Sequence, residues 1–147
     1  DFLPAGPRRV PEQLSQAVTD AKERRQFEQA CRDILRTVEA TAGFRRHNLA
    51  SAMTLLLGVS LQVARGIEIP DAETDGLMRG LNDQLAGLPA FLSLPADRRT
   101  QVYDTMVIVG GLIAGIAQNA AETRNAEMAA LARQMARDSL AQFGVKS

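Results

Sequence analysis

The sequence predicts an all-α fold, a single-domain bundle of about five helices around two central apolar, glycine-containing helices. Residues 106–117 carry no charge, and a run that is apolar on every side is typical of an enclosed helix or a membrane span. These twelve residues fall short of the roughly 20 that cross a bilayer, which favours a core helix. Residues 48–64 are also uncharged, and no segment shows the alternation of a strand.

Glycines interrupt the central run, and each costs a helix interior up to about 1 kcal/mol relative to alanine. Gly111 and Gly115 lie four positions apart on one helical face, where missing Cβ atoms let a neighbouring backbone approach closely. We expect that neighbour to be the 48–64 segment with its own Gly58. The alternative use of these glycines is a groove that admits an apolar ligand or a partner helix.

Length and charge suit one globular domain. A chain of 147 residues is expected to bury roughly 68–70% of the surface that it exposes when unfolded. The 17 basic and 17 acidic residues cancel, and no region departs far from neutrality. This argues against a nucleic-acid footprint or a polybasic membrane patch. We divide the chain into an irregular segment, 1–11, and a helical bundle domain, 12–147.

The first expected helix follows the proline-rich segment, whose prolines deny a helix its donors. Apolar residues then recur at three- and four-residue steps, as in an amphipathic helix. They are Leu14, Val18, Ala21, Ala30, Cys31, Ile34, Leu35 and Val38. The arginines Arg24 and Arg25 interrupt this stripe, so a break near Asp20 or Arg25 is possible. Gly43 is expected to end the helix in a left-handed conformation.

The remaining helices are placed by capping signals. Asn48 suits the N-cap of the first central helix, which stops at Gly66. A further helix is expected over residues 71–88, followed by a connector at 89–95. The second central helix should begin near Asp97 and end near residues 119–121. A last amphipathic helix is marked by Met128, Leu131, Met135 and Leu140. Gly144 is expected to end it. Since the linkers are short, we expect sequential helices to pack antiparallel.

Residues suited to catalysis are few. His47 is the only histidine, so neither a transition-metal site nor a cofactor is predicted, and a nucleophilic pair would depend on this one side chain. The acidic residues at 71–76 resemble the opening of a calcium loop, but Asn82 stands where a bidentate Glu is needed. Cys31 is the only cysteine and lies on the apolar stripe, where it is expected to act as a small hydrophobe.

Two polar side chains lie near the start of the second central helix. Tyr103 and Asp104 could pair with Asn48 if the two central helices lie antiparallel. We interpret the three as a buried hydrogen-bond network that fixes helix packing. An acid pair of the kind that cleaves glycosides stays open, although no pair stands out.

From Asn48 to Gly144 the chain resembles a functionally uncharacterised family of bacterial exported all-helical proteins. The likeness rests on the uncharged helix that opens with Asn48, its stop at Gly66, the Pro89-Ala-Phe91 segment, residues 97–103, the Gly110-Gly111 helix and an Ala/Arg-rich last helix. The resemblance implies a periplasmic or secreted location, with a cytoplasmic location as the alternative. It implies no catalytic residues.

The function expected from these features is non-catalytic protein binding, in the manner of a periplasmic immunity or accessory protein for a secreted toxin. Arginine forks capture carboxylates at interfaces. The candidate partner-binding residues are Arg45, Arg46, His47, Arg98 and Arg99. No nucleic acid and no membrane span is expected, and a homodimer is possible. The alternative is a carrier of a small apolar ligand between the central helices. A third class is a hydrolase built on His47 or on a carboxylate pair.

Overall fold

A computed structural model describes residues 8–66 and 94–143. These residues form five helices and no strand: α1 (Val10–Ser15), α2 (Ala21–Ala40), α3 (Leu49–Arg65), α6 (Ala96–Thr123) and α7 (Ala126–Gln142). The predicted all-α bundle is confirmed. The helix expected at 71–88, most of the connector after it and the stop at Gly144 lie outside the described residues.

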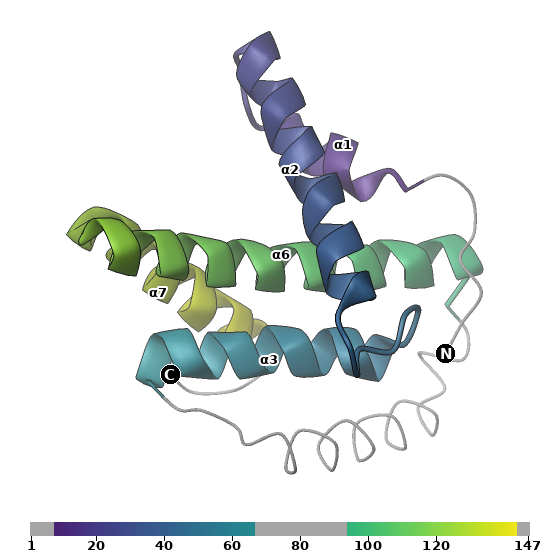
Figure 1. Ribbon diagram of the computed structural model, residues 1–147. Coiled ribbons are helices and arrows are strands. Elements are labelled where there is room, and N and C mark those ends of the chain that lie inside the picture. The colour runs from purple at the N-terminus through teal and green to yellow at the C-terminus, as the bar shows by residue number, and fades with distance from the viewer. Residues whose placement is uncertain (1–7, 67–93, 144–147) are drawn as a thin grey trace.

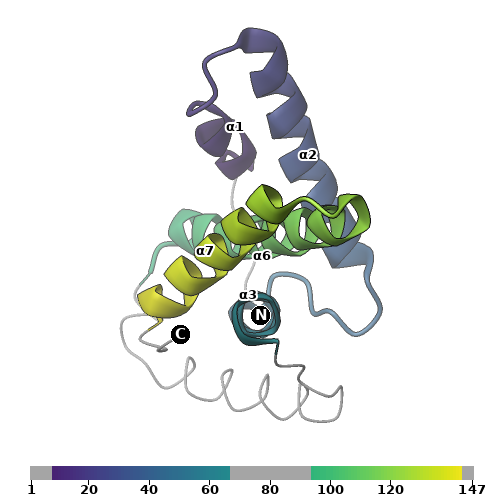
Figure 2. The same ribbon diagram turned by 90° about the vertical axis from the view of Figure 1, so that its left-hand side faces the viewer.

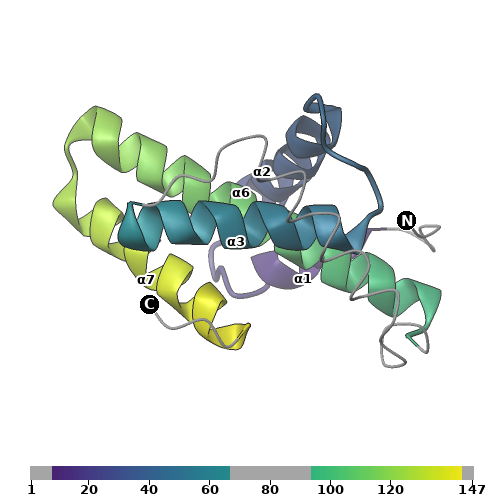
Figure 3. The ribbon, with the colours of Figure 1, turned by 90° about the horizontal axis from the view of Figure 1, so that it is seen from below.

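The helix α6 lies at the centre of the molecule and contains the uncharged run 106–117. It packs against α3 on one side and α2 on the other, and α7 completes a three-helix bundle with α3 and α6 (Figures 1 and 3). Buried residues of α6, among them Val107, Ile108 and Ile113, form the middle of the core. The two uncharged helices α3 and α6 are therefore packed together in the centre, as expected from the sequence.

The helices α3 and α6 run parallel. The sequence predicts that Asn48 could pair with Tyr103 and Asp104 if the two helices lie antiparallel. Residues further along α3 contact residues further along α6, as in two parallel helices. The ring of His47 lies beside that of Tyr103 at the start of both, and Leu55 lies beside Gly110 further along. Because α7 follows α6 directly, it is α7 that returns against them (Figure 3). The parallel course brings the amino-terminal ends of α3 and α6 together.

The helix α2 projects away from the bundle of α3, α6 and α7, and α1 packs beside it (Figure 2). The break predicted near Asp20 separates the two helices, and the Asp20 side chain caps α2 by accepting a hydrogen bond from the Glu23 backbone N–H at 2.9 Å. Within the described parts of the chain α2 makes no contact with α3. The expectation that sequential helices pack antiparallel is wrong for this pair, because α2 crosses α6 instead.

The predicted helix ends agree well with the structure. Asn48 is the N-cap of α3, and its Oδ1 accepts a hydrogen bond from the Ser51 N–H at 2.8 Å. Gly66 ends α3 with a left-handed φ of 69°, and Gly43 has a φ of 85°. The irregular segment assigned to 1–11 ends sooner than expected, since α1 already begins at Val10.

The close approach of α3 and α6 takes place at Gly110. A Cβ at Gly110 would lie 3.3 Å from Leu55 Cγ and 3.5 Å from Leu56 Cα, whereas one at Gly111 would lie 2.3 Å from Ile34 Cγ2 of α2. At Gly115 a Cβ would meet no described atom within 4 Å. Gly58 lies half-buried within α3. The glycines of α6 therefore serve two different neighbours, one on each side of the helix.

By length and hydropathy alone, α6 is one described helix that could cross a membrane. Within its most apolar 18-residue window, 44% of the residues are buried inside the bundle. The buried positions include Met106, Val107, Ile108 and Ile113. Fewer than half of the residues in this window are therefore covered by the neighbouring helices.

Candidate functional site

A cluster of charged and polar side chains lies where the amino-terminal segment, the end of α2 and the first turns of α6 meet. The Arg8 guanidinium donates from Nη1 to Glu39 Oε1 at 2.6 Å and from Nη2 to Glu39 Oε2 at 2.9 Å. Tyr103 donates its hydroxyl to Glu39 Oε2 at 2.9 Å. Arg8 Nη2 also lies 3.3 Å from Asp104 Oδ1. We call these four residues the Arg8 cluster.

Two carboxylates share the Arg8 guanidinium, and they differ in the hydrogen bonds that they accept. The side chains of Glu39 and Asp104 are only 6% and 1% exposed. Glu39 receives hydrogen bonds from Arg8 and Tyr103, whereas neither oxygen of Asp104 accepts one from the described residues. Asp104 therefore depends on the ion contact with Arg8 to offset the cost of burying its charge.

The pKa values of the cluster follow from this geometry. Burial raises the pKa of Asp104 to about 6; the Arg8 charge opposes this shift and the Glu39 charge adds to it. Burial also acts to raise the pKa of Glu39, but hydrogen bonds from Arg8 and Tyr103 outweigh it and lower that pKa. Burial raises the pKa of the Tyr103 phenol, which stays a donor to Glu39. Glu39 thus carries the stable negative charge of the cluster.

His47 lies beside the Arg8 cluster. Its ring centroid is 5.5 Å from that of Tyr103, and its backbone adopts a left-handed φ of 54°, which is uncommon for a residue with a Cβ. Burial lowers the pKa of His47; the Glu39 charge opposes this shift and Arg8 and Arg46 add to it. His47 is therefore half-buried against the Tyr103 ring instead of projecting freely from the surface.

The sequence placed Asn48, Tyr103 and Asp104 in one buried polar network, and all three are fully buried. Asn48 caps α3 by accepting a hydrogen bond from the Ser51 N–H, while Tyr103 donates to Glu39 and Asp104 contacts Arg8. Sequence reasoning missed Arg8 and Glu39, the two residues that hold the cluster together. Glu39 follows the apolar Val38 near the end of α2, which was the available signal of a position close to the core.

The predicted arginine edge divides between two neighbourhoods. Arg46 has a side chain 64% exposed with Nε 3.9 Å from Glu39 Oε2, and the exposed Arg45 precedes it in the same loop. Arg98 is exposed at the start of α6, where it lines a cavity with Val10 and Phe143. Arg99 is half-buried. Arg46 and Arg98 therefore have different neighbours.

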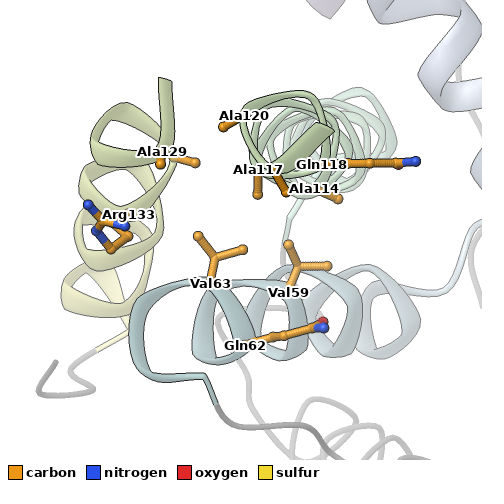
Figure 4. Close-up of a pocket in the computed structure, with 11 residues that line it drawn as sticks. Val59, Gln62, Val63, Ala114, Ala117, Gln118, Ala120, Ala129 and Arg133 are labelled. Carbon is orange, nitrogen blue, oxygen red and sulfur yellow. The ribbon is translucent and has the colours of Figure 1, made fainter. Parts of the chain in front are cut away.

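The larger of two described cavities lies where α3, α6 and α7 meet, with a volume of about 520 Å³ (Figure 4). Val59 and Val63 of α3 point toward Ala114 and Ala117 of α6, and Ala129 of α7 points in from the side. The lining is mostly small and apolar: Val59, Gln62, Val63, Ala114, Ala117, Gln118, Ala120, Ala121, Ala129, Ala132 and Arg133. Its polar atoms belong to two amides and one guanidinium.

A smaller cavity, of about 390 Å³, lies between α1, α3, the first turns of α6 and the end of α7. It is lined by Val10, Gln13, Met53, Arg98, Gln101, Val102, Thr105, Met106, Gln142 and Phe143. Within residues 8–66 and 94–143, no group of three or more His, Cys, Asp and Glu side chains could hold a metal ion. The two cavities therefore present apolar surface with amide, hydroxyl and guanidinium groups.

Fold and site together define an all-α bundle protein with a buried ion-pair cluster and two cavities. The larger cavity is lined mostly by small side chains, and the smaller one includes two methionines. The chain belongs to the family of unknown function DUF6683, whose family model matches residues 1–147. No curated protein and no solved structure gives a match. The resemblance to an uncharacterised family is thus confirmed at this level.

Proposed function

We propose that the protein is a non-catalytic binding module whose partner is another protein, in the manner of a periplasmic immunity or accessory factor for a secreted toxin. The observation that carries the proposal is the cavity between α3, α6 and α7. Its walls contain six alanines, at 114, 117, 120, 121, 129 and 132. These small side chains come from α6 and α7, and they allow the backbone of an incoming helix to approach closely.

The polar side chains that line this cavity can bind polar groups of a partner protein. Gln62, Gln118 and Arg133 supply amide and guanidinium groups at an otherwise apolar wall. A guanidinium stays protonated and acts as a fork for a carboxylate. The matching partner surface is a helix face with small or aliphatic residues and one acidic side chain for Arg133. The exposed Arg46 offers a second contact for an acidic partner.

The four residues of the Arg8 cluster have shifted pKa values, and they lie away from both cavities. Glu39 and Asp104 are engaged with Arg8, and Tyr103 with Glu39, inside the core. None of these four residues lines either described cavity. This separation supports a structural role for the Arg8 cluster, which holds α2 on α6, and a binding role for the cavity.

A capture experiment with matched variants tests the proposal. Tagged wild-type protein, Ala121→Trp and Ala130→Trp are used to recover partners from the cell envelope of the source bacterium. Ala121 is exposed and lines the cavity, so a tryptophan there fills it, whereas Ala130 is exposed on α7 and lines neither described cavity. We expect a stoichiometric partner with the wild type and with Ala130→Trp, and at least tenfold less with Ala121→Trp.

Other outcomes decide against the proposal. Recovery of no stoichiometric partner, or equal recovery with both tryptophan variants, contradicts a protein partner at this cavity. Sedimentation of the purified chain identifies a partner that is a second copy. A co-purified apolar ligand that native mass spectrometry detects on the wild type but not on Ala121→Trp supports the small-ligand carrier instead. Fractionation of the source cells tests the periplasmic or secreted location that we propose.

A further inference from the structure

The smaller cavity, beside Arg98, has the character of a ligand site independent of the proposed protein partner. Its walls come from four helices, and its floor includes Val10 and Met106, which are only 3% and 6% exposed. Met53 and Val102 add further apolar surface. A volume of about 390 Å³ is within the range of small-molecule sites. Methionine side chains adapt their shape to an apolar guest.

A large apolar side chain at the rim of this cavity is exposed to water. Phe143 ends α7 and is 37% exposed, one of two exposed large apolar side chains among the described residues, with Leu131. The other rim groups are amides and a hydroxyl, from Gln13, Gln101, Gln142 and Thr105. A guest with an apolar tail would cover Phe143 and the floor while leaving these polar groups hydrated.

Arg98 gives the cavity its charge. It is exposed, it is the one charged residue in the lining, and no carboxylate of the described residues pairs with it. A single guanidinium offers a two-armed site for one carboxylate, while a doubly charged phosphate would be only half compensated. Charge and shape together therefore select a molecule with one negative charge at the end of an apolar chain.

We propose that this cavity binds a medium-chain aliphatic carboxylate, with the carboxylate on Arg98 and the chain between Met53 and Met106. Large flexible side chains line this site, whereas small side chains line the cavity between α3, α6 and α7. The smaller cavity therefore suits a narrow flexible chain. The proposal is independent of a protein partner, because the two cavities share no lining residue.

Titration of the purified protein with decanoate, below its aggregation limit, tests the proposal. Calorimetry should show one site per chain, with octanoate about 16-fold weaker because each buried methylene contributes about a fourfold change in affinity. Decanol, which lacks the charge, should bind at least about tenfold more weakly. With ¹³C-methyl methionine, the signals of Met53 and Met106 should shift and that of Met128, in α7, should not.

Variants separate this site from a general apolar surface. Arg98→Gln should weaken decanoate about tenfold or more, and Thr105→Trp should abolish binding by filling the cavity at an exposed position. Arg133→Gln, at the other cavity, should leave the affinity unchanged. Equal binding of decanol and decanoate, an unaffected Arg98→Gln variant, or tighter binding of a short peptide ending in leucine overturns the proposal.

Discussion

Arg8 and Glu39, which are 31 positions apart in the chain, form a two-armed ion pair with N–O distances of 2.6 and 2.9 Å. This pair ties the segment before α1 to the end of α2, and Tyr103 extends the link to α6 by donating to the same carboxylate. The side chain of Arg8 is 25% exposed and that of Glu39 is 6% exposed. Because the pair is largely shielded from water, each partner depends on the other for its solvation.

Replacing Arg8 with methionine is the first test of this dependence. The variant keeps the apolar stem but leaves Glu39 and Asp104 buried without their shared cation, so we expect unfolding free energy to fall by about 2 to 3 kcal/mol. Urea unfolding at pH 7 measures the change. The control is Arg36→Met, which removes an exposed pair with Asp33 and should cost less than about 0.5 kcal/mol. Equal losses in both variants would contradict a special role for Arg8.

The raised pKa of Asp104 predicts how the free energy of unfolding changes with pH. Its pKa is about 6 in the folded protein and about 3.9 in an unfolded chain, so the folded state holds this proton more tightly. Stability contributed by Asp104 is therefore greatest below pH 4 and is lost as pH rises toward 6. Glu39 acts in the opposite direction, because its pKa is lowered in the folded protein.

Comparison with Asp104→Asn isolates this contribution, since the other groups of the cluster remain. Relative to that variant, the wild type should lose on the order of 2 kcal/mol of unfolding free energy between pH 4 and pH 6. Urea unfolding curves at several pH values measure it. A constant difference between the two proteins across this range would show that Asp104 does not change its protonation there.

Local signals predicted the helices better than they predicted the cluster. Asn48 and Gly66 mark the ends of α3 through chemistry that acts within one turn, so both were identified from the sequence. The contact of Arg8 with Glu39 joins residues far apart in the chain, and no local pattern reports it. The parallel course of α3 and α6 was missed for a related reason, because an apolar face fits a neighbour in either direction.

Two glycines of α6 should respond in opposite ways to alanine. At Gly111 the new Cβ would lie 2.3 Å from Ile34 Cγ2, so either the Ile34 side chain or α2 must shift, and we expect a loss of about 2 kcal/mol. At Gly115 the space is open, and the gain in helix propensity should stabilise by up to about 1 kcal/mol. Thermal unfolding should show a lower midpoint for Gly111→Ala and a higher one for Gly115→Ala. A higher midpoint for both would place Ile34 away from α6.

The Cys31 thiol reports whether α2 stays packed on the bundle. Its side chain is fully buried, and burial, aided by the Glu28 charge, raises its pKa, so little reactive thiolate is present. We expect a disulfide reagent to label the native protein slowly, through local opening of α2, and the urea-unfolded protein at once. The control is Ala30→Cys in a Cys31→Ala background, because Ala30 is exposed on the same helix. It should react at least about 100-fold faster than Cys31. Equal rates would mean that α2 leaves α6 freely, and the ion pairs of Arg8 would then be too weak to hold this helix in place.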